Sequence, residues 1–129
     1  MGACYSVYAK LKIKDNMEEE IVRILNKKIE RADEENVDYN IEGHNPEFVK
    51  PYNLEELLAT FFVEHQGNYT YKRLNNTIEV DSGFNASYGW HLVMYQAMKL
   101  IAPYLKNGSV LEIYDDDNAK YRVKDGELK

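Results

Sequence analysis

Tyrosine and lysine side chains alternate with apolar residues near the start of the chain, a spacing that suits the binding of unpaired nucleic-acid bases. Tyr8, Lys10 and Lys12 fall on one side of a period-2 pattern. Lys72 is expected on the same side of a neighbouring strand. Aromatic rings stack on bases and lysines neutralise phosphates, so an open sheet face that carries both could bind a single strand.

The same face is expected to carry groups that oppose phosphate binding. Glu79, Asp81 and Glu112 should point to this side of the sheet, and the usual RNA-recognition consensus is absent. An ordinary polar outer face is therefore the alternative reading. One of two alternating sets on the last strand must also be exposed: Lys120, Arg122 and Lys124, or Ala119, Tyr121 and Val123.

A concentrated acidic segment supports a different hypothesis, which we prefer at this stage. Residues 30–64 hold ten acidic and two basic residues, in a chain whose formal net charge is −6. Such a segment repels nucleic acid and attracts a basic protein surface, although a solvated acidic face is the alternative. The candidate contacts with a basic partner are Glu34, Glu35, Asp38, Glu55 and Glu56, with exposed aromatic anchors such as Tyr39, Phe48 or Tyr52.

Catalytic and metal-binding patterns are weak, and we expect neither a cofactor nor a metal. His44, His65 and His91 lack the spacing of a zinc site, and no glycine-rich phosphate loop occurs. Cys4 has no local nucleophile signature. A small-ligand binder or enzyme that uses the Tyr88–His91 region is the third hypothesis, and it requires a pocket there. No catalytic residue is assigned.

Length and composition predict a single domain, residues 1–129, without a membrane span. The chain is 44% apolar and 29% charged, as globular domains are. No apolar run approaches the roughly 20 residues that a membrane helix needs. One cysteine excludes a disulfide framework within the chain and favours a reducing, cytoplasmic setting.

Hydrophobic periodicity predicts the elements that position these residues. In chain order they are a strand over residues 3–14, helices over 15–36 and 53–66, a hairpin over 69–82, a helix from 87, and strands over 110–114 and 119–124. Asn53 and Glu56 fit a capping box. A two-residue turn at Asn75–Asn76 would place Tyr71 opposite Val80.

The element order predicts an α+β fold with a ferredoxin-like split βαβ core. The order is β-α-α-β-β-α-β-β, and without the second helix and the last strand it becomes β-α-β-β-α-β. Such a core has an antiparallel sheet with its helices packed on one face, and the extra strand extends the sheet beyond the fourth. An open sheet edge also makes a homodimer possible.

The second half of the chain carries a resemblance to known proteins. The resemblance lies in three short segments, residues 84–90 (FNASYGW), 101–105 (IAPYL) and 108–109 (GS). In these runs the chain resembles small ferredoxin-like proteins that bacterial phages and other mobile elements encode. The resemblance implies a bacterial cytoplasmic setting. Because that family mostly has no assigned activity, it transfers no functional residue.

Overall fold

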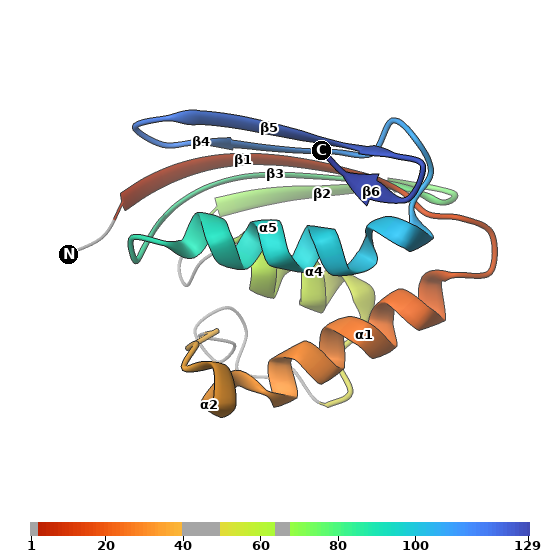
Figure 1. The fold of residues 1–129 in the computed structure, drawn as a ribbon, viewed down its shortest axis with the longest axis horizontal. Helices are drawn as coiled ribbons and strands as arrows, with labels where there is room; N and C mark the ends of the chain where they lie inside the picture. The colour runs from red at the N-terminus through yellow and green to blue at the C-terminus, as the bar shows by residue number, and fades with distance from the viewer. Residues whose placement is uncertain (1–2, 40–49, 64–67) are drawn as a thin grey trace.

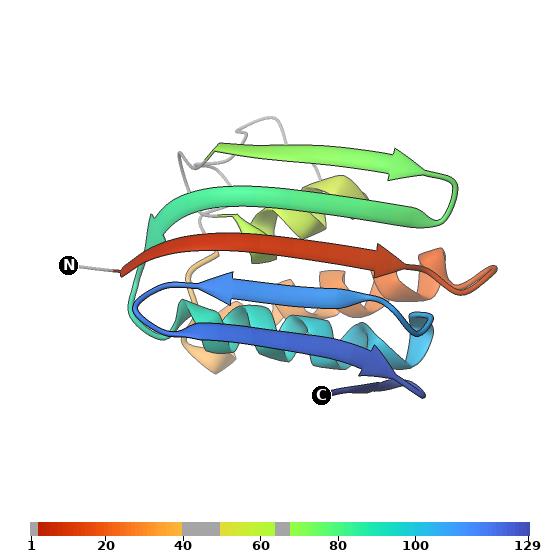
Figure 2. The same ribbon diagram turned by 90° about the horizontal axis from the view of Figure 1, so that it is seen from above.

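The computed structural model describes residues 3–39, 50–63 and 68–129. It confirms an α+β fold built on an antiparallel sheet of six strands in the order β2-β3-β1-β4-β5-β6 (Figure 2). The strands are β1 (Ala3–Lys12), β2 (Asn68–Leu74), β3 (Thr77–Ala86), β4 (Val110–Tyr114), β5 (Asn118–Lys124) and β6 (Glu127–Leu128). The sequence pattern did not indicate the short β6, which pairs only with the end of β5.

The described helices lie on one side of the sheet, as predicted (Figure 1). They are α1 (Glu18–Glu30), α2 (Ala32–Glu35), α4 (Leu54–Phe62), α5 (Trp90–Ile101) and the 3-10 turn η1 (Ala102–Tyr104). The α4 helix packs against β3, and α5 packs against β4. The α1 helix packs on α4 and α5 and lies farther from the sheet. One sheet face is therefore covered and the other carries no described helix.

The alternation in β1 sorts its side chains between the covered and open faces. Tyr5, Val7, Ala9 and Leu11 are buried in the core. They are buried because β1 lies between β3 and β4 and its inner face meets the helices. The residues between them point to the opposite, open face, because side chains along a strand alternate.

The β2–β3 hairpin has the predicted register. Leu74 pairs with Thr77, so Asn75–Asn76 form the two-residue loop, and Asn75 has a φ of 56°. This left-handed conformation is one that asparagine tolerates better than most residues. The predicted pairing of Tyr71 with Val80 is also confirmed.

Two predicted helix starts were early by three residues. The first helix begins at Glu18 rather than at residue 15, since Asn16 has a φ of 63°. The last begins at Trp90 rather than at Ser87, since Gly89 has a φ of 95°. Both conformations lie outside the helical region.

Gly89 offers no side chain to cap α5, and a buried tyrosine bonds to the backbone just before this helix. The Tyr5 hydroxyl donates a hydrogen bond to the Ser87 carbonyl oxygen at 3.2 Å. Backbone N–H groups at the start of α5 face the same hydroxyl. The pKa of Tyr5 is nevertheless raised, because burial outweighs these N–H groups. Tyr5 thus ties the centre of the sheet to the start of α5.

Candidate functional site

The open sheet face brings together the tyrosine and the lysines that the sequence singled out. Tyr8, Lys10 and Lys12 project from β1 on this side, and Lys72 projects from β2. Glu79 of β3 lies between Lys10 and Lys72, because it is the register partner of both. These residues therefore form one continuous patch across three adjacent strands.

The last strand adds further cations to the open face. Val123 is buried and Ala119 and Tyr121 are half-buried, while the residues that alternate with them are exposed. Tyr121 packs against Tyr95 of α5, with ring centroids 4.8 Å apart. The choice left open by the sequence is thereby decided. The exposed set on the open face is Lys120, Arg122 and Lys124.

Two of the three carboxylates expected on this face are held by neighbouring side chains. The Tyr8 hydroxyl donates to Glu79 Oε1 at 2.5 Å. The Tyr114 hydroxyl donates to Glu112 Oε1 at 2.5 Å, and Lys120 Nζ lies 3.4 Å from Glu112 Oε2. The hydrogen bond from Tyr114, more than the charge of Lys120, lowers the pKa of Glu112.

Glu79 is hydrogen-bonded to Tyr8 rather than ion-paired with the lysines beside it. The bond to the Glu79 carboxylate favours the protonated phenol and raises the pKa of Tyr8 to about 12. Neither Lys10 nor Lys72 forms an ion pair with any described carboxylate, although both flank Glu79. Tyr8 therefore bonds one oxygen of the Glu79 carboxylate, and the ammonium groups of Lys10 and Lys72 are not paired with a described acid.

Lys12 is positioned by a glycine beside it. Gly108 has a φ of 94°, and a Cβ placed there would lie 2.9 Å from Lys12 Nζ. The backbone N–H of Lys12 donates to Ser109 Oγ at 2.9 Å. Because residue 108 has no side chain, that of Lys12 can extend past it.

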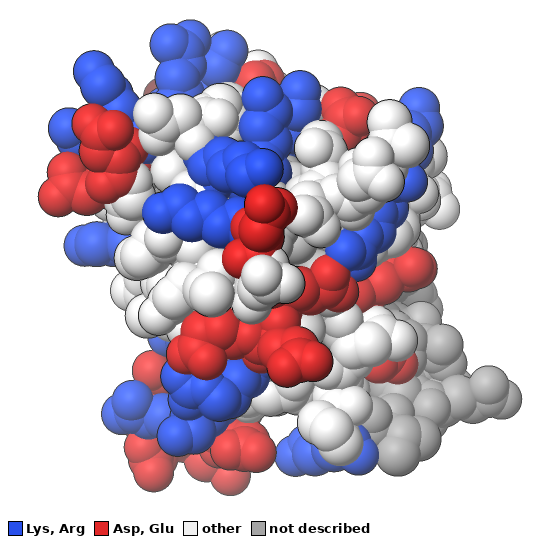
Figure 3. Space-filling view, turned by 90° about the vertical axis from the view of Figure 1, so that its right-hand side faces the viewer, with Lys and Arg blue, Asp and Glu red and all other residues white. Residues whose placement is uncertain are grey.

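A groove of about 580 Å³ lies at the hairpin end of the open face. Lysines from three separate segments line it, namely Lys10, Lys72 and Lys106, together with Glu79 and the hairpin loop. Figure 3 views the molecule from this end, and many lysine and arginine side chains lie in its upper part, where the sheet is. Arg73 also borders the groove, but its guanidinium is bound to the Glu18 carboxylate.

Sequence reasoning missed Lys106 and Tyr114. Lys106 follows the turn after Pro103. Its backbone bond to the Lys12 carbonyl, at 2.7 Å, and the bridge between Ile13 and Leu105 bring it to the end of β1. Tyr114 was assigned to a strand without a functional role. Its register beside Ser6 places it diagonally across from Tyr8. No local pattern signals either position.

Several of the acidic candidates are engaged in contacts within the chain. Glu34 pairs with Arg31 at 3.1 Å, and Glu35 pairs with Lys28 at 3.1 Å. Glu56 completes the predicted capping box with Asn53 at the start of α4. The side chains of Glu34, Asp38 and Glu55 are exposed.

The expectation that Tyr39 and Tyr52 are exposed anchors is wrong. Tyr39 is 4% exposed and Tyr52 is 8% exposed. The Tyr39 ring packs edge-on against Phe61 and lies 6.1 Å from the Trp90 ring. Apolar contact area stabilises these rings in the core more than exposure to water would. The third anchor, Phe48, lies outside the described residues.

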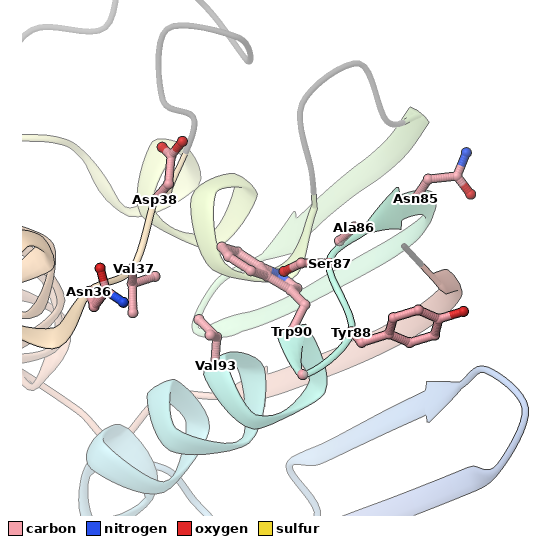
Figure 4. Close-up of a pocket in the computed structure, with 10 residues that line it drawn as sticks. Asn36, Val37, Asp38, Asn85, Ala86, Ser87, Tyr88, Trp90 and Val93 are labelled. Carbon is pink, nitrogen blue, oxygen red and sulfur yellow. The ribbon is translucent and has the colours of Figure 1, made fainter. Parts of the chain in front are cut away.

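The Tyr88–His91 region does border a pocket, as the third hypothesis requires. It measures about 550 Å³, and its lining includes Asp38, Ser87, Tyr88, Trp90 and Val93. Figure 4 shows the Tyr88 side chain directed away from the Trp90 ring. The Trp90 Nε1–H is already used, since it donates to the Phe61 carbonyl at 3.1 Å. The polar groups at this pocket do not converge on one point.

The described residues contain no group of three or more His, Cys, Asp or Glu side chains that could hold a metal ion. Within those residues no helix has both the length and the apolar character to cross a membrane. Comparison of the chain with models of known families, with curated proteins and with solved structures finds no match. The function is therefore argued from geometry and charge.

Proposed function

We propose that the open sheet face binds single-stranded nucleic acid. The observation that carries the proposal is the Tyr8–Glu79 hydrogen bond, which leaves Lys10 and Lys72 without a carboxylate partner among the described residues. Unpaired ammonium groups on one face attract phosphates and release counterions when a strand binds. Glu79, Asp81 and Glu112 keep negative charges on this face, so affinity depends on the excess of cations over these carboxylates.

Two tyrosines supply the aromatic surface that this function needs. Tyr8 and Tyr114 occupy diagonal positions on adjacent antiparallel strands, a separation of about 7–8 Å between backbones. Tyr114 is 40% exposed. Because each hydroxyl is held by a glutamate, the rings have fixed orientations. Tyr8 is half-buried. Rings with fixed orientations lose little entropy when a base stacks on them.

The Tyr8 hydroxyl offers a direct test. Tyr8→Phe keeps the ring but releases Glu79, which can then pair with Lys10 or Lys72. We expect affinity for a fluorescent homothymidine strand to fall by about three- to fivefold, the value of a surface ion pair. The double variant Y8F/E79Q should restore it. Unchanged affinity in Y8F, or no binding by the wild type at low salt, contradicts the proposal.

The strand order of the sheet supports a more specific fold type. We infer that the core is of the ferredoxin-like type, and the neighbouring order β2-β3-β1-β4 supports this. The outer position of α1 is a departure, because α4 contributes to the layer beneath the sheet. An experimental structure in which those four strands have another order would overturn the assignment.

Binding of a basic protein surface by the acidic segment is the second candidate. The exposed side chains of Glu34, Asp38 and Glu55 favour it. Reversal of Glu34 and Glu55 to Lys leaves the α4 cap and the Glu35–Lys28 pair intact. We expect this variant to lose a partner that the wild type captures from nuclease-treated bacterial lysate. Equal capture by both proteins would remove the hypothesis.

A homodimer stays a proposal as well. In the described sheet β2 is an edge strand, and an unpaired edge can pair with a second copy. Sedimentation over a range of concentrations tests this, and a monomer at every concentration would exclude it.

A further inference from the structure

We propose that the groove at the hairpin end of the open face binds the terminal phosphate of a single strand. The inference rests on the proposed nucleic-acid function and adds a preference for a phosphorylated end. The groove combines Lys10, Lys72 and Lys106, which come from β1, from β2 and from the segment after η1. Three lysines from three segments thus line one groove of about 580 Å³.

The walls of the groove are both tied to the end of β1. On one side, the Ile13 N–H donates to the Asn76 carbonyl oxygen at 2.8 Å, which fixes the hairpin loop. On the other side, the Lys106 N–H donates to the Lys12 carbonyl oxygen at 2.7 Å. The cations are therefore brought together before a ligand binds, so binding costs less ordering entropy.

Arg73 stabilises one wall but does not contribute free charge. Its Nε donates to the Asn75 carbonyl at 2.9 Å, and its Nη1 and Nη2 donate to the Glu18 carboxylate. The pKa of Glu18 is lowered, chiefly by the hydrogen bonds from Arg73. This side chain holds the loop in place, and its charge is cancelled by Glu18.

The remaining charges match a phosphomonoester better than a phosphodiester. The three lysines exceed the single lining carboxylate, Glu79, by two positive charges. Lys106 lies 3.9 Å from Asp15, but the Asp15 side chain is 80% exposed and does not line the groove. A terminal phosphate carries about −1.5 to −2 at neutral pH, whereas an internal phosphodiester carries a single charge.

The position of the groove also favours an end over the middle of a strand. The groove lies at the edge of the open face, beside the hairpin loop. A nucleic-acid strand that stacks on Tyr8 and runs along β1 past Lys10 would therefore reach the groove at its end. The loop adds amide and hydroxyl groups from Asn75 and Thr77, which hydrogen-bond phosphate oxygens.

The experiment compares one short homothymidine strand with a 5′-phosphate, with a 3′-phosphate and with hydroxyl groups at both ends. We expect one phosphorylated form to bind about tenfold more tightly than the hydroxyl form by competition anisotropy. The preference should shrink near pH 5.5, where a phosphomonoester with a second pKa near 6 gains a proton. Lys106→Gln should remove the preference, while Lys99→Gln on α5, an equal change in charge, should preserve it.

The outcomes separate this inference from the function on which it rests. Equal binding of all three strands overturns the end preference and leaves the proposed function standing. A phosphate preference that survives Lys106→Gln also overturns the assignment of the groove. Absence of binding by the hydroxyl strand, with thymidine monophosphate binding as tightly as the phosphorylated strand, overturns both in favour of a small-ligand site.

Discussion

The salt dependence of binding gives the most quantitative prediction. Among the described residues, five cations on the open face form no ion pair: Lys10, Lys12, Lys72, Arg122 and Lys124. Each phosphate contact with a single strand contributes roughly −0.7 to the slope of log K against log salt concentration. If all five engage phosphates, the slope is about −3.5.

The perturbation is the double substitution K10Q/K72Q. It removes the two ammonium groups beside Glu79 and keeps side chains of similar length, so we expect little change in the fold. Loss of two contacts should reduce the slope to about −2 and weaken binding most at low salt. The assay is fluorescence anisotropy of a labelled homothymidine strand over a salt series, with folding checked by circular dichroism.

The matched control is K27Q/K99Q, which changes the net charge equally on α1 and α5. Both lysines are exposed and lie on helices, on the side of the sheet opposite the proposed site. The control should keep the wild-type slope, because these lysines contact no bound phosphate. A slope that falls equally in both variants would mean that net charge acts without a defined site. A slope that falls in neither would refute the role of Lys10 and Lys72.

The remaining predictions concern stability and titration. Ultraviolet titration should show two tyrosines, Tyr39 and Tyr8, with a pKa of about 12, and Glu79→Gln should return only the pKa of Tyr8 toward 10. Since this pKa is raised on folding, its stabilisation is complete below about pH 10 and is lost as the pH rises towards 12. Gly108→Ala should lower the free energy of unfolding, measured in urea, by about 1–2 kcal/mol because φ is positive at this residue. Gly83→Ala, whose Cβ would lie no closer than 4.0 Å to its surroundings, should cost less. Tyr5→Phe should cost about 1 kcal/mol in the same assay through loss of the hydroxyl bond at α5.

Local patterns in the sequence predicted which side of each strand is buried. The alternation through β1 assigned Tyr8, Lys10 and Lys12 to the open face, and the structure agrees. The two-residue loop fixed the hairpin register and placed Lys72 opposite Glu79. Both predictions succeed because side-chain alternation and turn geometry depend on a few consecutive residues.

The same patterns could not predict how each side chain would be used. Lys72 and Glu79 are register partners of opposite charge, yet they form no ion pair, and Glu79 accepts a hydrogen bond from Tyr8. Tyr39 and Tyr52 lie in a segment that has no clear periodicity, so their burial could not be derived from local spacing. Burial there depends on contacts with distant residues such as Phe61.

The sequence by itself determined the α+β class, the order of the main elements and the inner and outer sides of their strands. Only the tertiary structure decided that β1 lies between β3 and β4, and that Lys106 joins Lys10 and Lys72 in one groove. The physical reason is the range of the interactions. Alternation and capping act over a few residues, whereas neighbouring strands and converging charges depend on how distant segments pack into one core.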